Sequence, residues 1–239
     1  MTKVALVTGA NKGIGYAIAA GLAAGGMSVL LAARDAGRGE QAAAALRGDV
    51  HPVVLDVTDP ESARAAAEHV EARFGHLDVL VNNAGITGPR GVAAVDADAV
   101  RAVFETNVFG VLTVTNALLP LLRRAPSARI VNLSSSVGSF GRTTDPESPF
   151  ASLPPSATYP ASKAALNALT VHYAKELRGT GILVNAADPG GTATDMTRAW
   201  GYRLDRSPAR AATIVVRLAT LGPDGPTGGF FDENGQVPW

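Results

Sequence analysis

Tyr159 and Lys163 stand four residues apart in the stretch TYPASK. Residues at this spacing lie on one face of a helix, so the lysine ammonium can act on the tyrosine phenol. A phenol has a pKa of about 10 and exchanges protons poorly near neutral pH unless a positive charge stabilises its phenolate. Lowering that pKa by about three units requires about 4 kcal/mol, which Lys163 and a second cation can supply together. The alternative for this pair alone is a half-buried tyrosine beside a solvated lysine.

Pro160 indicates where in the helix Tyr159 lies. Proline is tolerated only in the first turn of a helix and biases the preceding residue away from helical geometry. Tyr159 is therefore predicted to lie at the start of its helix.

Asn107 is a second candidate, because it interrupts an apolar stripe. The stripe follows steps of three and four residues along the helical pattern at 97–122. A buried amide needs hydrogen-bond partners. Asn107 therefore either fixes the register of a core helix or orders a water or a lysine in an active site.

Three serines at 134–136 follow the apolar run RIVNL at 129–133. If that run is a parallel strand, the serines stand at its carboxyl end, where ligands of such sheets bind. One of the hydroxyls can face a ligand there, and a turn or cap role is the alternative.

The stretch TGANKGIG, from Thr8 to Gly15, separates an apolar run from a helical pattern. A glycine-rich turn lets the backbone approach an anion, and the helix start offers free N–H groups and partial positive charge. This arrangement predicts a phosphate site, although a tight turn with close packing is the alternative. Its spacing, Gly-x-x-x-Gly-x-Gly, also differs from the common Gly-x-Gly-x-x-Gly.

Two basic residues bear on the choice of cofactor. Lys12 lies inside the turn, and Arg34 ends the second apolar run, where a unit that prefers NAD places an acid. A cation pair near the adenosine ribose favours a 2′-phosphate, so the pattern predicts NADP(H) over NAD(H). Asp56, at the end of the third run, can accept a hydrogen bond from the adenine amino group. Ordinary surface charges and a loop cap are the alternatives for these residues.

The elements that must position these residues alternate along the chain. Apolar runs typical of parallel strands covered on both faces are separated by helical patterns, and Asp59 followed by Pro60 is a typical helix start. The sequence therefore predicts an α/β fold: a single doubly wound Rossmann-type domain over residues 1–239, with a parallel sheet of about seven strands and helices on both faces. The runs are KVALVTG, SVLLAAR, HPVVLDV, LDVLVNNAG, ARIVNLSS, ILVNAADPG and GGFF.

The composition limits the classes of partner that the protein is expected to bind. Of 239 residues, 46% are hydrophobic and 18% charged, with a formal net charge of zero, which disfavours nucleic acid or an anionic membrane surface as partner. The chain has no cysteine and its four histidines form no ligand pair, so we expect no metal site. No apolar run of membrane-spanning length and no signal-peptide pattern is evident. We expect a cytoplasmic protein that binds a small molecule; monomer and homo-oligomer both stay open.

The motifs resemble, in type and in order, those of the short-chain dehydrogenase/reductase family over nearly the whole chain. TGANKGIG is similar to the family's cofactor turn, NNAG at 82–85 to the motif of its fourth strand, and TNVFG to the segment bearing its active-site asparagine, here Asn107. VNLSSS is similar to its serine motif, with Ser135 the best match, and YPASK to its Tyr-x-x-x-Lys motif. DPGGTATDM resembles the Pro-Gly segment that contacts nicotinamide, through Thr192 or Thr194. The ending TGGFFDENGQVPW and the TGANKGIG turn are similar to the carbonyl-reductase branch.

The resemblance implies hydride transfer between NADP(H) and a carbonyl or alcohol carbon. In the reducing direction Ser135 hydrogen-bonds the substrate oxygen and Tyr159 donates a proton to it. Lys163 lowers the tyrosine pKa and binds the nicotinamide ribose, while Asn107 holds a water of the proton relay. The implied cofactor-binding residues are Gly9, Asn11, Lys12, Gly13, Ile14, Gly15, Arg34, Asp56, Val57, Asn83, Ala84, Gly85, Tyr159, Lys163, Pro189, Gly190, Thr192 and Thr194.

The expected activity is accordingly that of an NADP(H)-dependent carbonyl reductase acting on a small-molecule carbonyl or alcohol. A dedicated biosynthetic ketoreductase, such as an acyl-carrier β-keto reductase, and a catalytically silent NADP(H)-sensing regulatory protein are the alternatives.

Two segments are expected to border the substrate. The Pro- and Ser-rich insertion around 138–157 is longer than the connection usual in the family, and loops of this length are commonly lids or disordered. The segment around 195–207 is the other expected lid, with Trp200 and Tyr202 as candidate substrate contacts or as ordinary packing residues.

Overall fold

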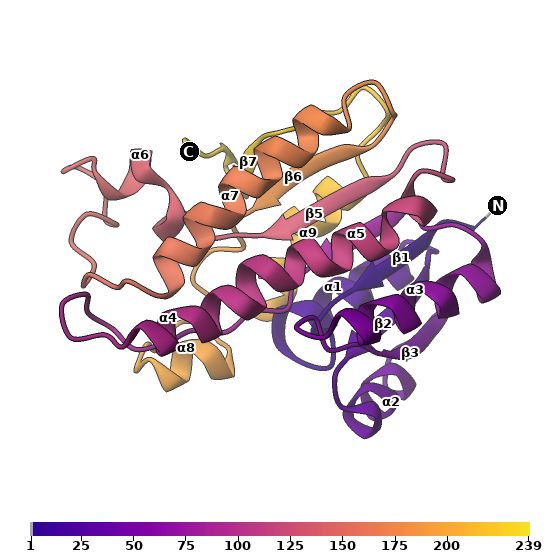
Figure 1. Ribbon diagram of the computed structural model, residues 1–239, viewed down its shortest axis with the longest axis horizontal. Coiled ribbons are helices and arrows are strands. Elements are labelled where there is room, and N and C mark those ends of the chain that lie inside the picture. Colours follow the sequence, from indigo (N-terminus) through magenta and orange to yellow (C-terminus); the bar gives the residue numbers. More distant parts are fainter. Residues whose placement is uncertain (1) are drawn as a thin grey trace.

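A single twisted sheet runs through the computed structural model, which describes residues 2–239 (Figure 1). The strand order is β3-β2-β1-β4-β5-β6-β7-β8, and every neighbouring pair is parallel except β7 with β8. The order reverses direction at β1 and β4, which is the switch point where doubly wound sheets bind ligands. The strands are β1 Val4–Val7, β2 Ser28–Ala33, β3 Val50–Val54, β4 Val79–Asn82, β5 Arg129–Leu133, β6 Leu183–Ala187, β7 Phe230–Asp232 and β8 Gly235–Gln236.

Each of the seven apolar runs overlaps one strand, and β8 is an eighth strand that the sequence did not predict. β8 has no apolar run of its own and pairs antiparallel to β7 through Phe231 with Gln236 and Asp232 with Gly235. The Asp232 carboxylate accepts hydrogen bonds from the N–H groups of Asn234 and Gly235, at 2.8 and 3.1 Å, and so closes the hairpin. A turn interaction rather than hydrophobic periodicity creates this strand.

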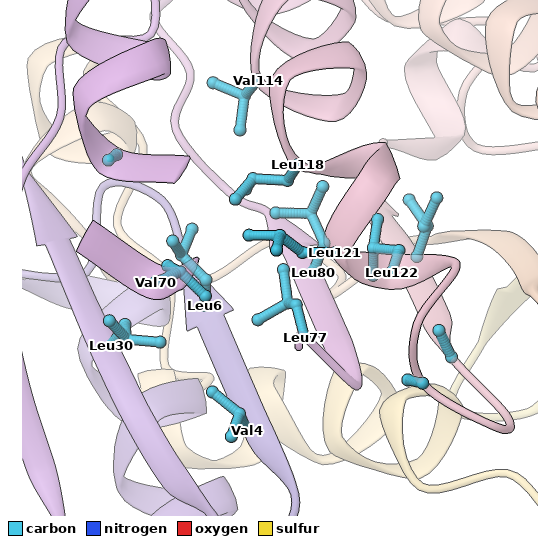
Figure 2. Close-up of a cluster of buried hydrophobic side chains, with 14 of the residues drawn as sticks. Val4, Leu6, Leu30, Val70, Leu77, Leu80, Val114, Leu118, Leu121 and Leu122 are labelled. Atoms are coloured by element: carbon cyan, nitrogen blue, oxygen red, sulfur yellow. The ribbon is translucent and has the colours of Figure 1, made fainter. Parts of the chain in front are cut away.

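Helices cover both faces of the sheet (Figure 1). Alternate strand residues pack into opposite layers. Val4 and Leu6 pack with α3, α5 and α7, as Figure 2 shows for part of that layer, whereas Ala5 and Val7 pack with α1 and α9. The helices are α1 Gly13–Ala24, α2 Ala36–Ala44, α3 Pro60–Phe74, α4 Ala97–Phe104, α5 Gly110–Leu122, α6 Phe140–Thr143, α7 Tyr159–Glu176, α8 Asp195–Ala199 and α9 Pro208–Ala219; η1 Glu105–Phe109 is a π-helical turn and η2 Ser136–Gly138 a 3-10 turn.

The long apolar helical pattern forms one continuous helix over Ala97–Leu122, made of α4, η1 and α5. Its length and mean hydropathy of 1.4 would suit a membrane span, contrary to the expectation that no segment reaches that length. The helix instead lies along the sheet, where Val114, Leu118 and Leu122 are buried in the core (Figure 2). Its apolar character is explained by packing within the domain.

Two local predictions about helix starts are confirmed. Asp59 caps α3, because its carboxylate accepts the Glu61 N–H at 3.0 Å, and Pro60 occupies the first helical position. α7 begins at Tyr159 with Pro160 in its first turn, which places the phenol at the helix end nearest the carboxyl edge of the sheet.

Candidate active site

A cavity of about 710 Å³ lies at the carboxyl ends of β5 and β6. Ser135 and Tyr159 line it, together with the turn that follows β6. Its outer part is apolar and aromatic, formed by the insertion and the segment around α8. The side chains of that outer part include Phe140, Phe150, Leu153, Met196, Trp200 and Leu204.

Ser135, Tyr159 and Lys163 meet at this cavity, as the sequence predicted. The Ser135 hydroxyl lies beside the phenol of Tyr159, and both residues line the cavity. The Lys163 Nζ lies 5.4 Å from the centroid of the Tyr159 ring and donates to the carbonyl oxygen of Leu133 at 2.7 Å. Lys163 is only 4% exposed. The end of β5 therefore holds the lysine while the first turn of α7 presents the tyrosine.

The other two serines of the triplet serve different contacts. The Ser134 hydroxyl donates to the Asn167 side chain at 2.5 Å, and the Ser136 hydroxyl donates to Asp188. Both serines are buried. Ser135 is thus the member of the triplet whose hydroxyl reaches Tyr159.

The electrostatics of the tyrosine differ from the sequence-based expectation. Burial, followed by the negative charge of Asp188, raises the pKa of Tyr159 above its ordinary value, and the hydrogen bond from Ser135 only partly offsets this. Burial also lowers the pKa of Lys163 to about 8, against the opposing effect of Asp188. The chain alone thus favours a neutral phenol, and the predicted lowering of the tyrosine pKa requires further positive charge beside it.

Asn107 lies in the π-helical turn η1, and its amide is fully engaged. Its Oδ1 accepts the Ile86 N–H at 2.8 Å, and its Nδ2 donates to the Ile86 carbonyl at 2.9 Å and to the Ser162 hydroxyl at 3.0 Å. The amide joins the loop after β4 to α7, so the structural alternative accounts for its side-chain contacts. Single π-helical turns occur often at functional sites, and this one brings Asn107 within reach of Gly85, where an added Cβ would lie 3.2 Å from Oδ1.

The glycine-rich turn is tight and closely packed. Gly9 and Gly13 have φ of 61° and 60°, and a Cβ on Gly15 would lie 2.4 Å from the Asn83 side-chain nitrogen. α1 starts after Lys12 without a side-chain cap and without an acidic residue in its first turn. Its first N–H groups and positive dipole end are therefore available to an anion. Asn11 lies in the same turn, and Ile14 lines the cavity.

Asn83 and Ala84 support this turn from the end of β4. The Asn83 side chain donates to the carbonyl oxygens of Thr8 and Gly9, at 2.8 and 3.1 Å. The Thr8 hydroxyl in turn accepts the N–H groups of Asn83 and Ala84, at 2.9 and 3.0 Å. These contacts position the turn, so the structure shows Asn83 in a supporting role.

The residues expected at the adenosine end are not all drawn together. Arg34 is exposed just after β2, and across residues 2–239 no carboxylate lies within 4 Å of it. Lys12 instead pairs with Asp195 of α8 at 2.7 Å. The Asp56 carboxylate accepts the N–H and hydroxyl of Thr58, at 2.9 and 2.7 Å, which lowers its pKa and corresponds to the loop-cap alternative. Val57 is buried against Gly110.

The turn after β6 connects the cavity with the cofactor turn. Pro189 and Gly190 line the cavity, and Gly190 has a φ of 72°. The buried Thr192 hydroxyl donates to the Gly190 carbonyl at 2.8 Å. Thr194 caps α8, and its methyl group would lie 3.8 Å from a Cβ on Gly13. Thr194 thus packs next to the glycine-rich turn.

The two expected lid segments both line the cavity. Trp200 meets the Tyr159 ring edge-on, with centroids 5.7 Å apart at 82°. Arg90, which the sequence analysis missed, lies over both Trp200 and Tyr202, at 5.4 and 5.0 Å, and donates to the Trp200 carbonyl at 2.5 Å. No local pattern marks this arginine, because its partners are more than a hundred residues away in the chain.

Asp188 was also missed. It directly follows β6, is 6% exposed and lines the cavity beside Tyr159. An acid at the carboxyl end of an apolar strand was the available signal, because that edge is where the serines were already placed.

Comparisons with known proteins agree with this geometry. The sequence profile described as short chain dehydrogenase matches residues 3–204. The chain is 40% identical over 228 residues to short-chain dehydrogenase anuI of Penicillium roqueforti, covering 91% of this chain and 88% of that protein. It is 36% identical over 197 residues to the 3-oxoacyl-[acyl-carrier-protein] reductase FabG of Salmonella typhimurium, covering 82% and 76%. A gluconate 5-dehydrogenase from Burkholderia cenocepacia, solved in complex with NADP and tartrate, superposes with a TM-score of 0.84 at 27% identity, covering 96% of this chain and 92% of that one. The chain therefore belongs to the short-chain dehydrogenase/reductase family.

Proposed function

We propose that this oxidoreductase reduces the carbonyl group of a neutral, largely apolar compound with NADPH, as a carbonyl reductase. The observation that carries the proposal is that the side chains of Ser135 and Tyr159 line one largely apolar cavity, with the Lys163 ammonium 5.4 Å from the centroid of the Tyr159 ring.

Each of these residues has a separate role in the reduction. Bound NADPH supplies the hydride from its nicotinamide. The Ser135 hydroxyl donates a hydrogen bond to the carbonyl oxygen, which polarises that bond and stabilises the negative charge that develops on the oxygen. The neutral phenol of Tyr159 gives its proton to the same oxygen. The Lys163 ammonium stabilises the phenolate that remains. The Asn107 amide holds the first turns of α7, which carry Tyr159 and Lys163, against the loop after β4.

The cofactor preference rests on charge at the adenosine end. Arg34 is exposed and has a free guanidinium after β2, which suits a 2′-phosphate better than the ribose hydroxyl of NAD. The solved gluconate 5-dehydrogenase with NADP supports the same choice. Lys12 joins Arg34 only when its ion pair with Asp195 opens.

The lining of the cavity supports the substrate class. Arg90 and Asp188 are the charged residues in its lining, and each is already engaged within the protein. A charged substrate would lose its hydration there without gaining a free counter-ion. The aromatic walls instead suit a bulky ketone or aldehyde without a charge near the carbonyl. We place this reaction in the cytoplasm, without a nucleic-acid or membrane partner.

Reduction of an acyl-carrier substrate is the second candidate, because the FabG relative has that activity in its name. The insertion at 138–157 argues for a different substrate, since it supplies the apolar wall formed by Phe140, Phe150 and Leu153.

The test measures NADPH consumption through its near-ultraviolet absorbance, with a panel of ketones, aldehydes, quinones and β-ketoesters. The panel also includes a thioester of a β-keto acid. We expect turnover of bulky neutral carbonyls that Tyr159→Phe reduces at least 100-fold, while NADPH binding measured by calorimetry is unchanged. Preferred turnover of the thioester would favour the acyl-carrier activity. Tight NADPH binding without turnover of any carbonyl would favour the silent sensor protein and overturn the proposal.

A further inference from the structure

A single buried carboxylate joins the two turns that form the inner end of the cavity. Oδ2 of Asp188 accepts the backbone N–H of Ser136 at 2.9 Å and also the Ser136 hydroxyl. Oδ1 accepts the N–H of Gly190 at 2.8 Å. Asp188 thus connects the serine turn after β5 to the Pro-Gly turn after β6, directly beside Ser135.

This carboxylate has hydrogen bonds but no counter-ion in contact. Within the described residues 2–239, no lysine, arginine or histidine nitrogen lies within 4 Å of it. The three donors are neutral N–H and O–H groups. A buried charge that is solvated only by neutral donors keeps its electrostatic effect on nearby groups, because the surrounding dielectric constant is low.

The charges around Asp188 come from several elements. Lys163 lies on α7, and Arg206 precedes α9 but is bound to Glu233. Arg90, from the loop after β4, lines the same cavity, where it stacks on Trp200 and donates to the Trp200 carbonyl. Asp188 acts on both titratable groups of the site: its charge raises the pKa of Tyr159 and opposes the fall in the pKa of Lys163.

We propose that Asp188 is a positioning residue of the active site, whose carboxylate locks the Ser135 turn onto the Gly190 turn and places a negative charge beside Tyr159 and Lys163. Protonated Tyr159 is the form that donates a proton during reduction. Asp188 would therefore extend reduction to higher pH. This last step rests on the proposed function, whereas the effect on Lys163 does not.

The charge effect can be measured without cofactor or turnover. The chain has four lysines, of which Lys3, Lys12 and Lys175 are exposed. In a sample labelled with carbon-13 lysine, the Lys163 signal is expected to titrate near pH 8. Lys163→Arg assigns it. We expect Asp188→Asn to move the Lys163 midpoint down by about one pH unit.

Two variants separate charge from other effects. Asp224→Asn makes the same chemical change in the exposed loop after α9 and should leave the midpoint unchanged. Ser136→Ala removes one hydrogen bond but keeps the carboxylate, so it should lower activity at every pH without moving the midpoint. If Asp188→Asn does not fold, Asp188→Ser is expected to give the same shift. An unchanged midpoint in the neutral variant would overturn the charge effect.

The effect on catalysis is tested with the pH dependence of kcat/KM for NADPH-driven reduction. We expect the alkaline limb to move to lower pH in Asp188→Asn, by about one unit, and to stay in place in Ser136→Ala. A uniform loss of activity with no movement of the limb would reduce Asp188 to a structural role. A shifted Lys163 midpoint in a protein that turns over no carbonyl would retain the charge effect and reject the reductase function.

Discussion

The Lys12 ammonium lies 2.7 Å from the Asp195 carboxylate and ties the glycine-rich turn to the first residue of α8. Arg198, one turn along α8, binds the other oxygen of Asp195 at 2.5 Å. All three side chains are exposed. An exposed ion pair therefore connects the glycine-rich turn to the segment around α8 that lines the cavity.

Breaking this ion pair is expected to favour NADPH. Asp195→Asn frees Lys12 for the 2′-phosphate and should lower the KM for NADPH about two- to fivefold, because exposed ion pairs are weak. The KM for NADH should stay the same. Asp98→Asn is the matched control, since Asp98 at the start of α4 pairs with Arg101 three residues later, as Asp195 pairs with Arg198. An equal change for both cofactors would contradict a role in phosphate binding.

Arg34 is expected to decide between the cofactors. Arg34→Ala removes the free guanidinium at the end of β2, so kcat/KM with NADPH should fall at least tenfold. The value with NADH should change less than twofold, because NADH has no 2′-phosphate. Steady-state kinetics with both cofactors measure this, and Arg38→Ala on the exposed face of α2 serves as control. A loss shared equally by the two cofactors would show that Arg34 acts on the fold.

The buried ammonium of Lys163 is expected to lower the free energy of unfolding. Its pKa is about 8 in the folded chain and 10.5 in an exposed lysine, so between these values the unfolded chain binds more protons. Stability should therefore rise as pH increases from 8 to 10.5.

A neutral replacement tests this. Lys163→Met should be more stable than the natural chain at pH 7 by about 2 kcal/mol, after the lost hydrogen bond to Leu133 is subtracted. The advantage should shrink as pH rises through the same window. Urea unfolding at several pH values measures it, and a stability difference that is constant with pH would contradict a buried charge.

Arg90 is expected to hold the aromatic wall in place. Arg90→Ala removes the cation from between Trp200 and Tyr202, where each cation–π contact is worth about 0.5–1 kcal/mol. The KM for bulky carbonyls should rise about fivefold, while kcat changes little because Ser135 and Tyr159 are untouched. Arg90→Lys keeps the charge but not the planar stacking, so it should recover only part of the loss. A fall in kcat with KM unchanged would place Arg90 in the chemical step instead.

The sequence by itself determined the order of strands and helices and most of the site. Hydrophobic runs predicted seven strands because parallel strands are buried on both faces. Pro160 predicted the start of α7 because a proline ring fits only in the first helical turn. Glycines 9, 13 and 15 predicted a tight turn between the first strand and helix, and the motifs placed Ser135 and Tyr159 together. Each of these inferences depends on local spacing or on the common edge of a parallel sheet.

Only the tertiary structure decided which partner each polar group has. The amide of Asn107 is occupied by Ile86 and Ser162, Lys12 is paired with Asp195, and Arg90 is stacked on Trp200. These contacts join residues far apart in the chain, and several residues of the same type would satisfy the local pattern equally well. The placement of the Asp188 charge beside Tyr159 likewise could not be predicted from a local pattern. Its effect depends on burial and distance, which arise from packing β5, β6 and α7 together rather than from any one segment.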